Sequence, residues 1–169
     1  MFHCCFQWAI LLLSPFFLCA QEDKLAAYMA ALEGRWVGHF IIHSPASGYS
    51  ETFVVKQDYW IDDGALWGVA VSERKSGLQS ARSRTHMEGG ILISEVMRGT
   101  DKEIFIGVFH EGGILWLPAN MARAEDYQIK ETIVMQAGQR KLETEGFDSY
   151  NYEGDVAHII YRGKLTFVE

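Results

Sequence analysis

The chain has 169 residues, 49% of them hydrophobic and 22% charged. This balance is typical of one globular domain with a real core and argues against a disordered chain. The formal net charge is −7, from 15 Lys and Arg against 22 Asp and Glu. An acidic balance argues against nucleic acid and anionic membrane surfaces as partners. A basic ligand or a neutral apolar one fits this charge better.

The first segment has the pattern of an export signal. Residues 8–20 form an apolar run interrupted only by Ser14 and Pro15, and the first charged residue is Glu22. Such a run is shorter than the roughly 20 residues that span a bilayer, but it suits the hydrophobic part of a secretory signal peptide. We expect cleavage after Ala20, export to the periplasm or the extracellular space, and no stable membrane insertion after cleavage. Lipidation at Cys19 and an uncleaved core segment are the alternatives.

All three cysteines lie in this leader: Cys4, Cys5 and Cys19. Cleavage therefore leaves a mature domain, residues 21–169, without any cysteine. A domain of this length has enough core to fold without disulfides. Thiol nucleophiles and thiolate metal sites are excluded from it.

Two different periodicities follow the leader. Residues 22–33 place apolar side chains on one helical face and are followed by Gly34, which predicts one short amphipathic helix. Apolar residues then alternate with polar ones, and glycine turn signals recur about every 8–12 residues. This pattern predicts an all-β fold, a single antiparallel up-and-down β-barrel of about 8–10 strands, because closure removes exposed strand edges. A two-sheet sandwich is the alternative.

The first expected strand isolates a large side chain, since Trp36 stands between Gly34 and Gly38. Arg162 lies near the middle of the last expected strand. First and last strands pair in an up-and-down barrel, so we expect Arg162 to stack on Trp36. Such a cation–π contact contributes about 0.5–2 kcal/mol.

The Gly34-x-Trp36 motif, the β-meander and Arg162 together resemble the calycin group, which includes lipocalins, fatty-acid-binding proteins and avidins. The resemblance implies a barrel whose interior holds a small, mainly hydrophobic molecule. It also implies that Trp36 and Arg162 form a structural seam and take no part in binding.

Two carboxylates fall on otherwise apolar strand faces, Glu95 in "ILISEVM" and Glu131 in "YQIKETIVM". Inward-facing carboxylates are costly unless they are paired, hydrated or bound to something. They would hold a cationic ligand or act as an acid–base pair, unless they lie at a barrel mouth in contact with water. Trp67, expected to face the core, and Tyr161 complete the candidate ligand-binding residues. No catalytic residue is assigned.

The remaining polar patterns are less specific. Arg82, Arg84 and His86 alternate along one strand, as an anion site or, more simply, a solvated strand face. His39 and His43 would lie about 13 Å apart on a strand, too far to share a metal. We therefore expect no metal and no cofactor, with haem bound through His158 as the alternative.

The sequence contains no nucleophile elbow, phosphate loop, zinc-protease motif or dinucleotide fingerprint. This favours binding over catalysis. We interpret the chain as an exported lipocalin-like binding protein with a small, apolar ligand in its barrel. The alternatives are a barrel enzyme that uses an interior carboxylate or tyrosine for proton transfer, a haem-binding barrel, and a purely structural envelope barrel.

Overall fold

The computed structural model describes residues 14–120, 122 and 125–168, with side chains from residue 23 onward. One helix precedes ten strands. The elements are α1 (Ser14–Leu32), β1 (Gly34–Ser44), β2 (Tyr49–Asp62), β3 (Ala65–Arg74), β4 (Gly77–Glu88), β5 (Ile91–Arg98), β6 (Asp101–His110), β7 (Gly113–Pro118), β8 (Tyr127–Gln136), β9 (Gln139–Tyr152) and β10 (Asp155–Phe167). No helix among the described residues combines the length and the hydropathy needed to cross a membrane.

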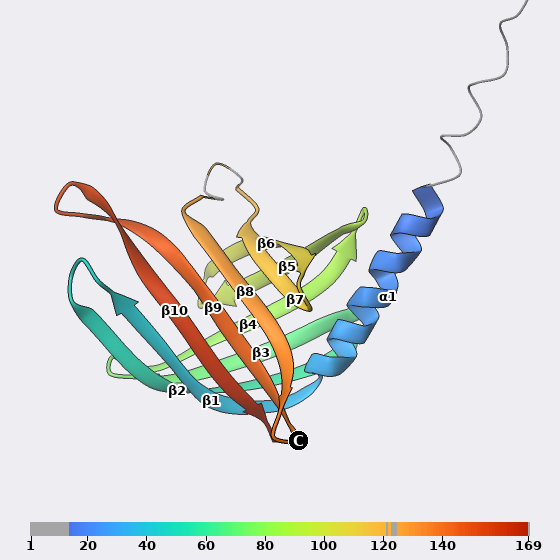
Figure 1. Ribbon diagram of the computed structural model, residues 1–169, viewed down its shortest axis with the longest axis horizontal. Helices are drawn as coiled ribbons and strands as arrows, with labels where there is room; N and C mark the ends of the chain where they lie inside the picture. The colour runs from blue at the N-terminus through green and yellow to red at the C-terminus, as the bar shows by residue number, and fades with distance from the viewer. Residues whose placement is uncertain (1–13, 121, 123–124, 169) are drawn as a thin grey trace, which may run out of the picture.

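The strands form one closed barrel (Figure 1). Each strand pairs antiparallel with the next, and β10 returns to pair with β1 from Trp36 opposite Phe167 to His43 opposite Ile160. The predicted all-β, up-and-down barrel is confirmed, and the two-sheet sandwich is not formed. Glycine turn signals were a reliable guide, as Asp63-Gly64 illustrates. Both residues have positive φ, 48° and 71°, as a tight hairpin turn requires.

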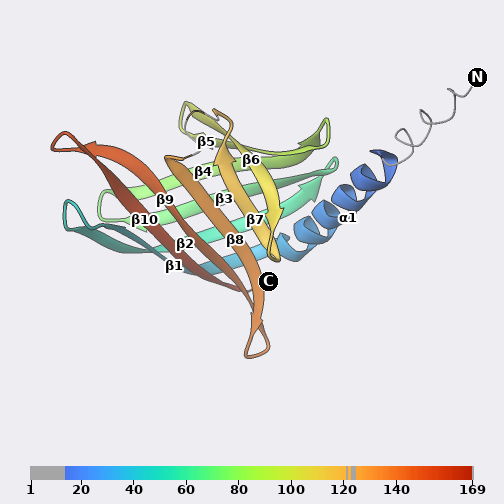
Figure 2. The same cartoon turned by 45° about the horizontal axis from the view of Figure 1, so that its top comes forward.

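The barrel has two different ends. The β2–β3, β4–β5, β6–β7 and β8–β9 turns lie at one end, together with α1 and the end of β10, and we call this the helix end. The other five turns lie at the opposite end, called the far end. In Figures 1 and 2 the helix runs along the helix end and continues away from the barrel. The two ends therefore differ in whether a helix covers them.

The last turns of α1 cover the helix end. Leu25, Met29 and Leu32 are buried, which confirms the predicted apolar helix face. Trp36 is fully buried beneath them, and its indole Nε1 donates a hydrogen bond of 2.6 Å to the carbonyl of Leu32. The helix is longer than predicted, because it begins at Ser14 and runs through the expected cleavage point after Ala20.

The residue that stacks near Trp36 is Arg140, and the prediction of Arg162 is wrong. The Arg140 guanidinium lies 5.7 Å from the Trp36 ring centroid and 3.5 Å from that of Phe167, and it donates to the carbonyl of Ala31 at 3.1 Å. Phe167 pairs with Trp36, so both point inward, whereas Arg162 lies five residues earlier and points outward. The alternation of side chains between the two faces of a strand thus decides which arginine reaches Trp36.

Candidate ligand-binding site

The inner faces of the strands enclose a cavity of about 230 Å³ between the two barrel ends. One wall is made of small side chains, since Ala70 on β3 pairs with Ala81 on β4, and Ser83 and Thr85 follow. Large side chains from the helix and the other strands complete the lining together with two arginines. These are Tyr28, Tyr59, Phe105, Trp116, Tyr127, Glu131, Arg82 and Arg98. The contrast between small and large residues leaves the space in the barrel.

Glu131 brings a carboxylate into this cavity. It lies on β8, where it pairs with Ile114 of β7 on one side and Thr144 of β9 on the other. The Tyr28 hydroxyl donates to Glu131 Oε2 at 3.2 Å, and Trp116 Nε1 donates to the same oxygen at 2.8 Å. Among the described residues no side chain hydrogen-bonds the other oxygen, Oε1. The half-buried carboxylate thus has one oxygen held by two donors and one oxygen without a side-chain partner among the described residues.

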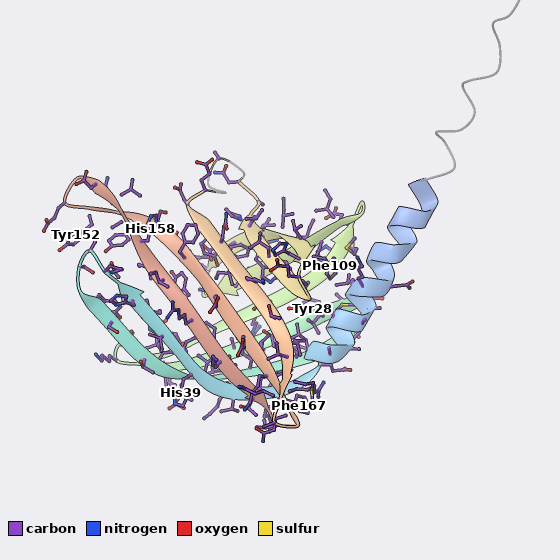
Figure 3. All side chains as sticks on the ribbon, viewed as in Figure 1. Tyr28, His39, Phe109, Tyr152, His158 and Phe167 are labelled. Carbon is purple, nitrogen blue, oxygen red and sulfur yellow. The ribbon has the colours of Figure 1, made fainter. Side chains whose placement is uncertain are left out.

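Figure 3 shows the origin of the Tyr28 contact, with Tyr28 placed where α1 meets the barrel. The helix therefore does more than cover the barrel end, because it contributes a hydroxyl to the interior. Leu25 and Met29, three residues before and one after Tyr28, anchor the same helix face in the core. The position of the hydroxyl is set by this packing.

The electrostatics of the site follow from burial. Loss of solvent raises the pKa of Glu131, and the hydrogen bonds from Trp116 and Tyr28 oppose the rise without cancelling it. Burial also raises the pKa of Tyr28 and Tyr59, and the nearby Glu131 carboxylate adds to both shifts. The two phenols therefore stay neutral hydrogen-bond donors at physiological pH. No cationic side chain in the described part of the chain pairs with Glu131.

Two interior glycines fix the aromatic rings around the carboxylate. A Cβ added to Gly107 would lie 2.7 Å from the Trp116 ring and 2.5 Å from Leu92. A Cβ added to Gly68 would lie 2.7 Å from the Tyr59 ring. These distances are shorter than van der Waals contact, so each ring lies against a backbone that carries no side chain. The Trp116 indole keeps the orientation in which Nε1 points at Glu131.

Of the four predicted ligand-binding residues, Glu131 and Tyr161 point inward. Tyr161 pairs with Ile42 and Gly146, nearer the far end than Glu131, and it does not line the cavity. Burial, followed by the charge of Asp148, raises its pKa. Glu131 is therefore the predicted residue that the structure brings to the cavity.

Glu95 points outward, where its carboxylate forms an ion pair of 2.9 Å with Lys102. The inner face of β5 carries Ser94, which accepts a 3.0 Å hydrogen bond from Thr85 across the β4–β5 ladder. The prediction of an inward Glu95 failed because its apolar neighbours, Ile93 among them, also face outward. An apolar outer face produced the misleading pattern.

Trp67 also lies on the outer face, contrary to the expectation that it faces the core. It pairs with Trp60 and with Arg84, whose guanidinium lies 5.6 Å from the Trp67 ring centroid. Arg82 and His86 have the same strand parity, with small residues of β4 pointing inward between them. Arg82 is exposed and also borders the interior cavity, whereas the His86 side chain is only 14% exposed, so the solvated-face interpretation holds only in part.

His158 does not line the cavity either. It lies on the outer face of β10, where Nδ1 is 3.0 Å from the Ser149 hydroxyl and the ring meets Phe147 edge-on at 5.5 Å between centroids. Figure 3 shows it toward the far end, away from Tyr28. The described residues contain no group of three or more His, Cys, Asp or Glu side chains arranged to hold a metal.

Sequence reasoning missed Tyr28, Tyr59 and Trp116 as members of this site. Trp116 has a usable signal, because it alternates with Ile114 in "ILWL". Placing it beside Glu131 requires the register across the long β7–β8 connection, which alternation alone does not supply. Tyr28 lay on the predicted helix face, but the pattern does not say which strand that face meets.

No protein-family model and no curated protein sequence matches the chain. Among solved structures, the chain is similar to the S-type phycobiliprotein lyase CPES from Guillardia theta. The two share 8% sequence identity with a TM-score of 0.53, over 90% of this chain and 98% of the lyase. The likeness concerns the fold alone.

Proposed function

We propose that the chain is an exported binding protein that holds a small, mainly hydrophobic ligand in its barrel. The observation that carries the proposal is the interior cavity of about 230 Å³ beside the half-buried carboxylate of Glu131, which has no described side chain hydrogen-bonded to Oε1. A water molecule takes about 30 Å³ of liquid volume, so the cavity has room for roughly eight waters or a ligand of similar size.

Packing supports a binding role for this space. Protein interiors are close-packed, with few voids larger than a water molecule. The chain achieves such packing at the helix end, where Trp36, Ile114 and Leu142 are at most 1% exposed. The cavity lies beside this dense region and is bordered by Ala70 and Ala81, where larger residues would fill it. The cavity therefore results from small side chains at these positions and not from poor packing throughout the barrel.

The lining has the composition of a small-molecule site. Binding pockets are mostly apolar and carry a few polar groups that orient the ligand. Here the apolar surface comes from Phe105 and Ile129 among others, and the orienting groups include Glu131 and Gln57. The similarity of fold to a phycobiliprotein lyase is consistent with the same general role, a protein that handles a small molecule.

An enzyme that uses two interior carboxylates does not fit the structure. That form required Glu95 and Glu131 to converge in one pocket, and Glu95 lies outside, paired with Lys102. A second acidic group near Glu131 is not present among the described residues that line the cavity. Binding therefore accounts for the site with fewer assumptions than proton transfer between carboxylates.

Export is part of the proposal. Removal of residues 1–20 would shorten α1 without removing Leu25, Tyr28, Met29 or Leu32, the helix residues that pack on the barrel. The mature domain, residues 21–169, would keep the cavity and the Tyr28 hydroxyl. N-terminal sequencing of the secreted chain checks this part, with Gln21 as the expected first residue.

Native mass spectrometry of the full chain, purified from its own source, tests the binding function. The wild type should carry an additional small mass that is lost on denaturation. The variant Ala81→Phe fills the cavity from β4 and should lack that mass, while Ser80→Phe, on the outer face of the same strand, should retain it. A wild-type chain without bound mass, or Ala81→Phe with undiminished bound mass, would contradict the proposal.

A further inference from the structure

We infer that the ligand presents a protonated amine to Glu131 Oε1, so that the cavity is a site for small organic cations. This inference rests on the proposed function and names the ligand class for the same cavity.

Glu131 has no cationic partner among the described residues. Buried carboxylates in proteins are normally paired, because an uncompensated charge in a low-dielectric interior is very unfavourable. Glu131 has two neutral donors, Tyr28 and Trp116, and both contact Oε2. Other carboxylates of the barrel do have cations, for example Glu51 with Arg74 at 2.6 Å. A ligand cation at Oε1 would supply the partner that Glu131 lacks among the described residues.

Aromatic side chains lie around the same carboxylate. Tyr28, Tyr59 and Trp116 all line the cavity, and Glu131 lies close enough to influence the ionisation of both tyrosines. The faces of such rings attract cations within about 6 Å of the ring centroid, and cages of this kind recognise alkylated ammonium groups. The lining also includes two cationic side chains, Arg82 and Arg98, of which Arg98 is paired with Glu103. The ligand cation is therefore placed beside Glu131 and these three rings.

Electrostatic steering also favours a cationic ligand. The chain has a net charge of −7, which favours the approach of cations over anions. The size of the cavity limits the ligand to roughly eight to twelve non-hydrogen atoms, scaled from the volume that water occupies. A compact aromatic or cyclic amine satisfies both the charge and the volume.

The test compares 2-phenylethylamine with 2-phenylethanol, which has the same size and shape but no charge. Isothermal titration calorimetry of the full chain in phosphate buffer, free of amine buffers, gives both affinities. We expect the amine to bind about tenfold or more tightly than the alcohol, because a charge-assisted hydrogen bond forms in a buried site. Phenylacetate should not bind, since it would bring a second carboxylate beside Glu131.

Three variants identify the responsible group. Glu131→Gln should remove the preference for the amine over the alcohol, while Glu95→Gln, which alters an outer carboxylate, should leave it unchanged. Tyr28→Phe keeps the ring but removes one donor to Oε2, which raises the pKa of Glu131 further and should reduce the preference for the amine without removing it. Thermal unfolding of each variant confirms that the titrated protein is folded. If Glu131→Gln does not fold, an undiminished preference in Tyr28→Phe overturns the inference.

The outcomes separate this inference from the proposed function. Equal binding of amine and alcohol, both abolished by Ala81→Phe, would overturn the cation site and leave the barrel as a binding protein. An amine preference that survives Glu131→Gln would also overturn it. A bound native ligand that is neutral or anionic by mass spectrometry would contradict the cation site while supporting the proposed function. Absence of a bound native mass would contradict the proposed function, and failure of 2-phenylethylamine to bind would overturn the cation site.

Discussion

Replacement of Trp36 by alanine tests the role of the helix end most severely. The side chain is 0% exposed, its indole Nε1 donates to the Leu32 carbonyl at 2.6 Å, and its ring meets Phe167 edge-on at 5.3 Å. Truncation of a buried tryptophan to alanine costs about 3–5 kcal/mol of unfolding free energy. We expect a loss in this range, because the surrounding barrel backbone has little freedom to collapse into the space.

Two further variants divide this loss into its parts. Trp36→Phe keeps a ring but leaves the Leu32 carbonyl without its donor, and we expect a loss of about 1–3 kcal/mol. Trp60→Ala removes a tryptophan that is 43% exposed on the outer face, and it should cost less than about 1 kcal/mol.

Urea unfolding followed by circular dichroism measures all three variants without relying on tryptophan fluorescence. The affinity for any cavity ligand should be nearly unchanged in folded Trp36→Ala. A loss below about 1 kcal/mol for Trp36→Ala would refute the conclusion that Trp36 is central to the packing of the helix end. Normal stability combined with lost ligand binding would show that Trp36 belongs to the binding site.

Two other predictions concern single side chains. Arg140→Ala should lower the unfolding free energy by about 1–3 kcal/mol, since it loses the Trp36 and Phe167 contacts and the Ala31 hydrogen bond. Arg162→Ala, on the outer face, should change the unfolding free energy by no more than about 0.5 kcal/mol. Equal losses for the two variants in a urea titration would contradict the role of Arg140 at the seam. Glu131→Gln should flatten the pH dependence of stability. The pKa of Glu131 is raised above 4.5 in the folded state. The ligand-free wild type should therefore lose stability relative to the variant as pH rises from 4.5 through the raised pKa. Tyr28 and Tyr59, the titratable groups that face Glu131, stay neutral over that pH range. Urea midpoints that run parallel for the wild type and Glu131→Gln from pH 4 to 8 would refute the desolvation of the carboxylate.

The barrel itself was predictable from the sequence, because the evidence for it repeats along the chain. Alternation recurs in strand after strand, and turns such as Asp63-Gly64 carry residues that favour positive φ. An error in one strand does not change the architecture. The helix was predicted from a single segment, and its apolar face was correct while its first residue was not.

The site was only partly predictable, because it depends on parity and register. Arg162 and Arg140 are both arginines on the last two strands, and only the pairing of Trp36 with Phe167 shows which one faces inward. Glu95 was misplaced because the outer face of β5 is apolar, with Ile91 49% exposed. Sequence reasoning assumes that the apolar side of a strand faces inward, and this barrel departs from that rule locally.

Glu131 was placed correctly, but its partners come from separate elements. Tyr28 belongs to α1 and Trp116 to β7, at sequence separations of 103 and 15 residues from Glu131. Alternation identifies the face on which each residue lies within its own element. It does not give the three-dimensional convergence of a helix and two strands on one oxygen atom.

The central claim is that a ligand binds inside the barrel next to Glu131. The indole N–H resonance of Trp116 in a ¹H–¹⁵N correlation spectrum tests it most directly, because Trp116 Nε1 donates to Glu131 at 2.8 Å. Comparison with Trp116→Phe assigns this resonance. Addition of 2-phenylethylamine should shift it while the outer-face indoles of Trp60 and Trp67 stay in place. Shifts confined to Trp60 and Trp67, with an unmoved Trp116, would contradict the account.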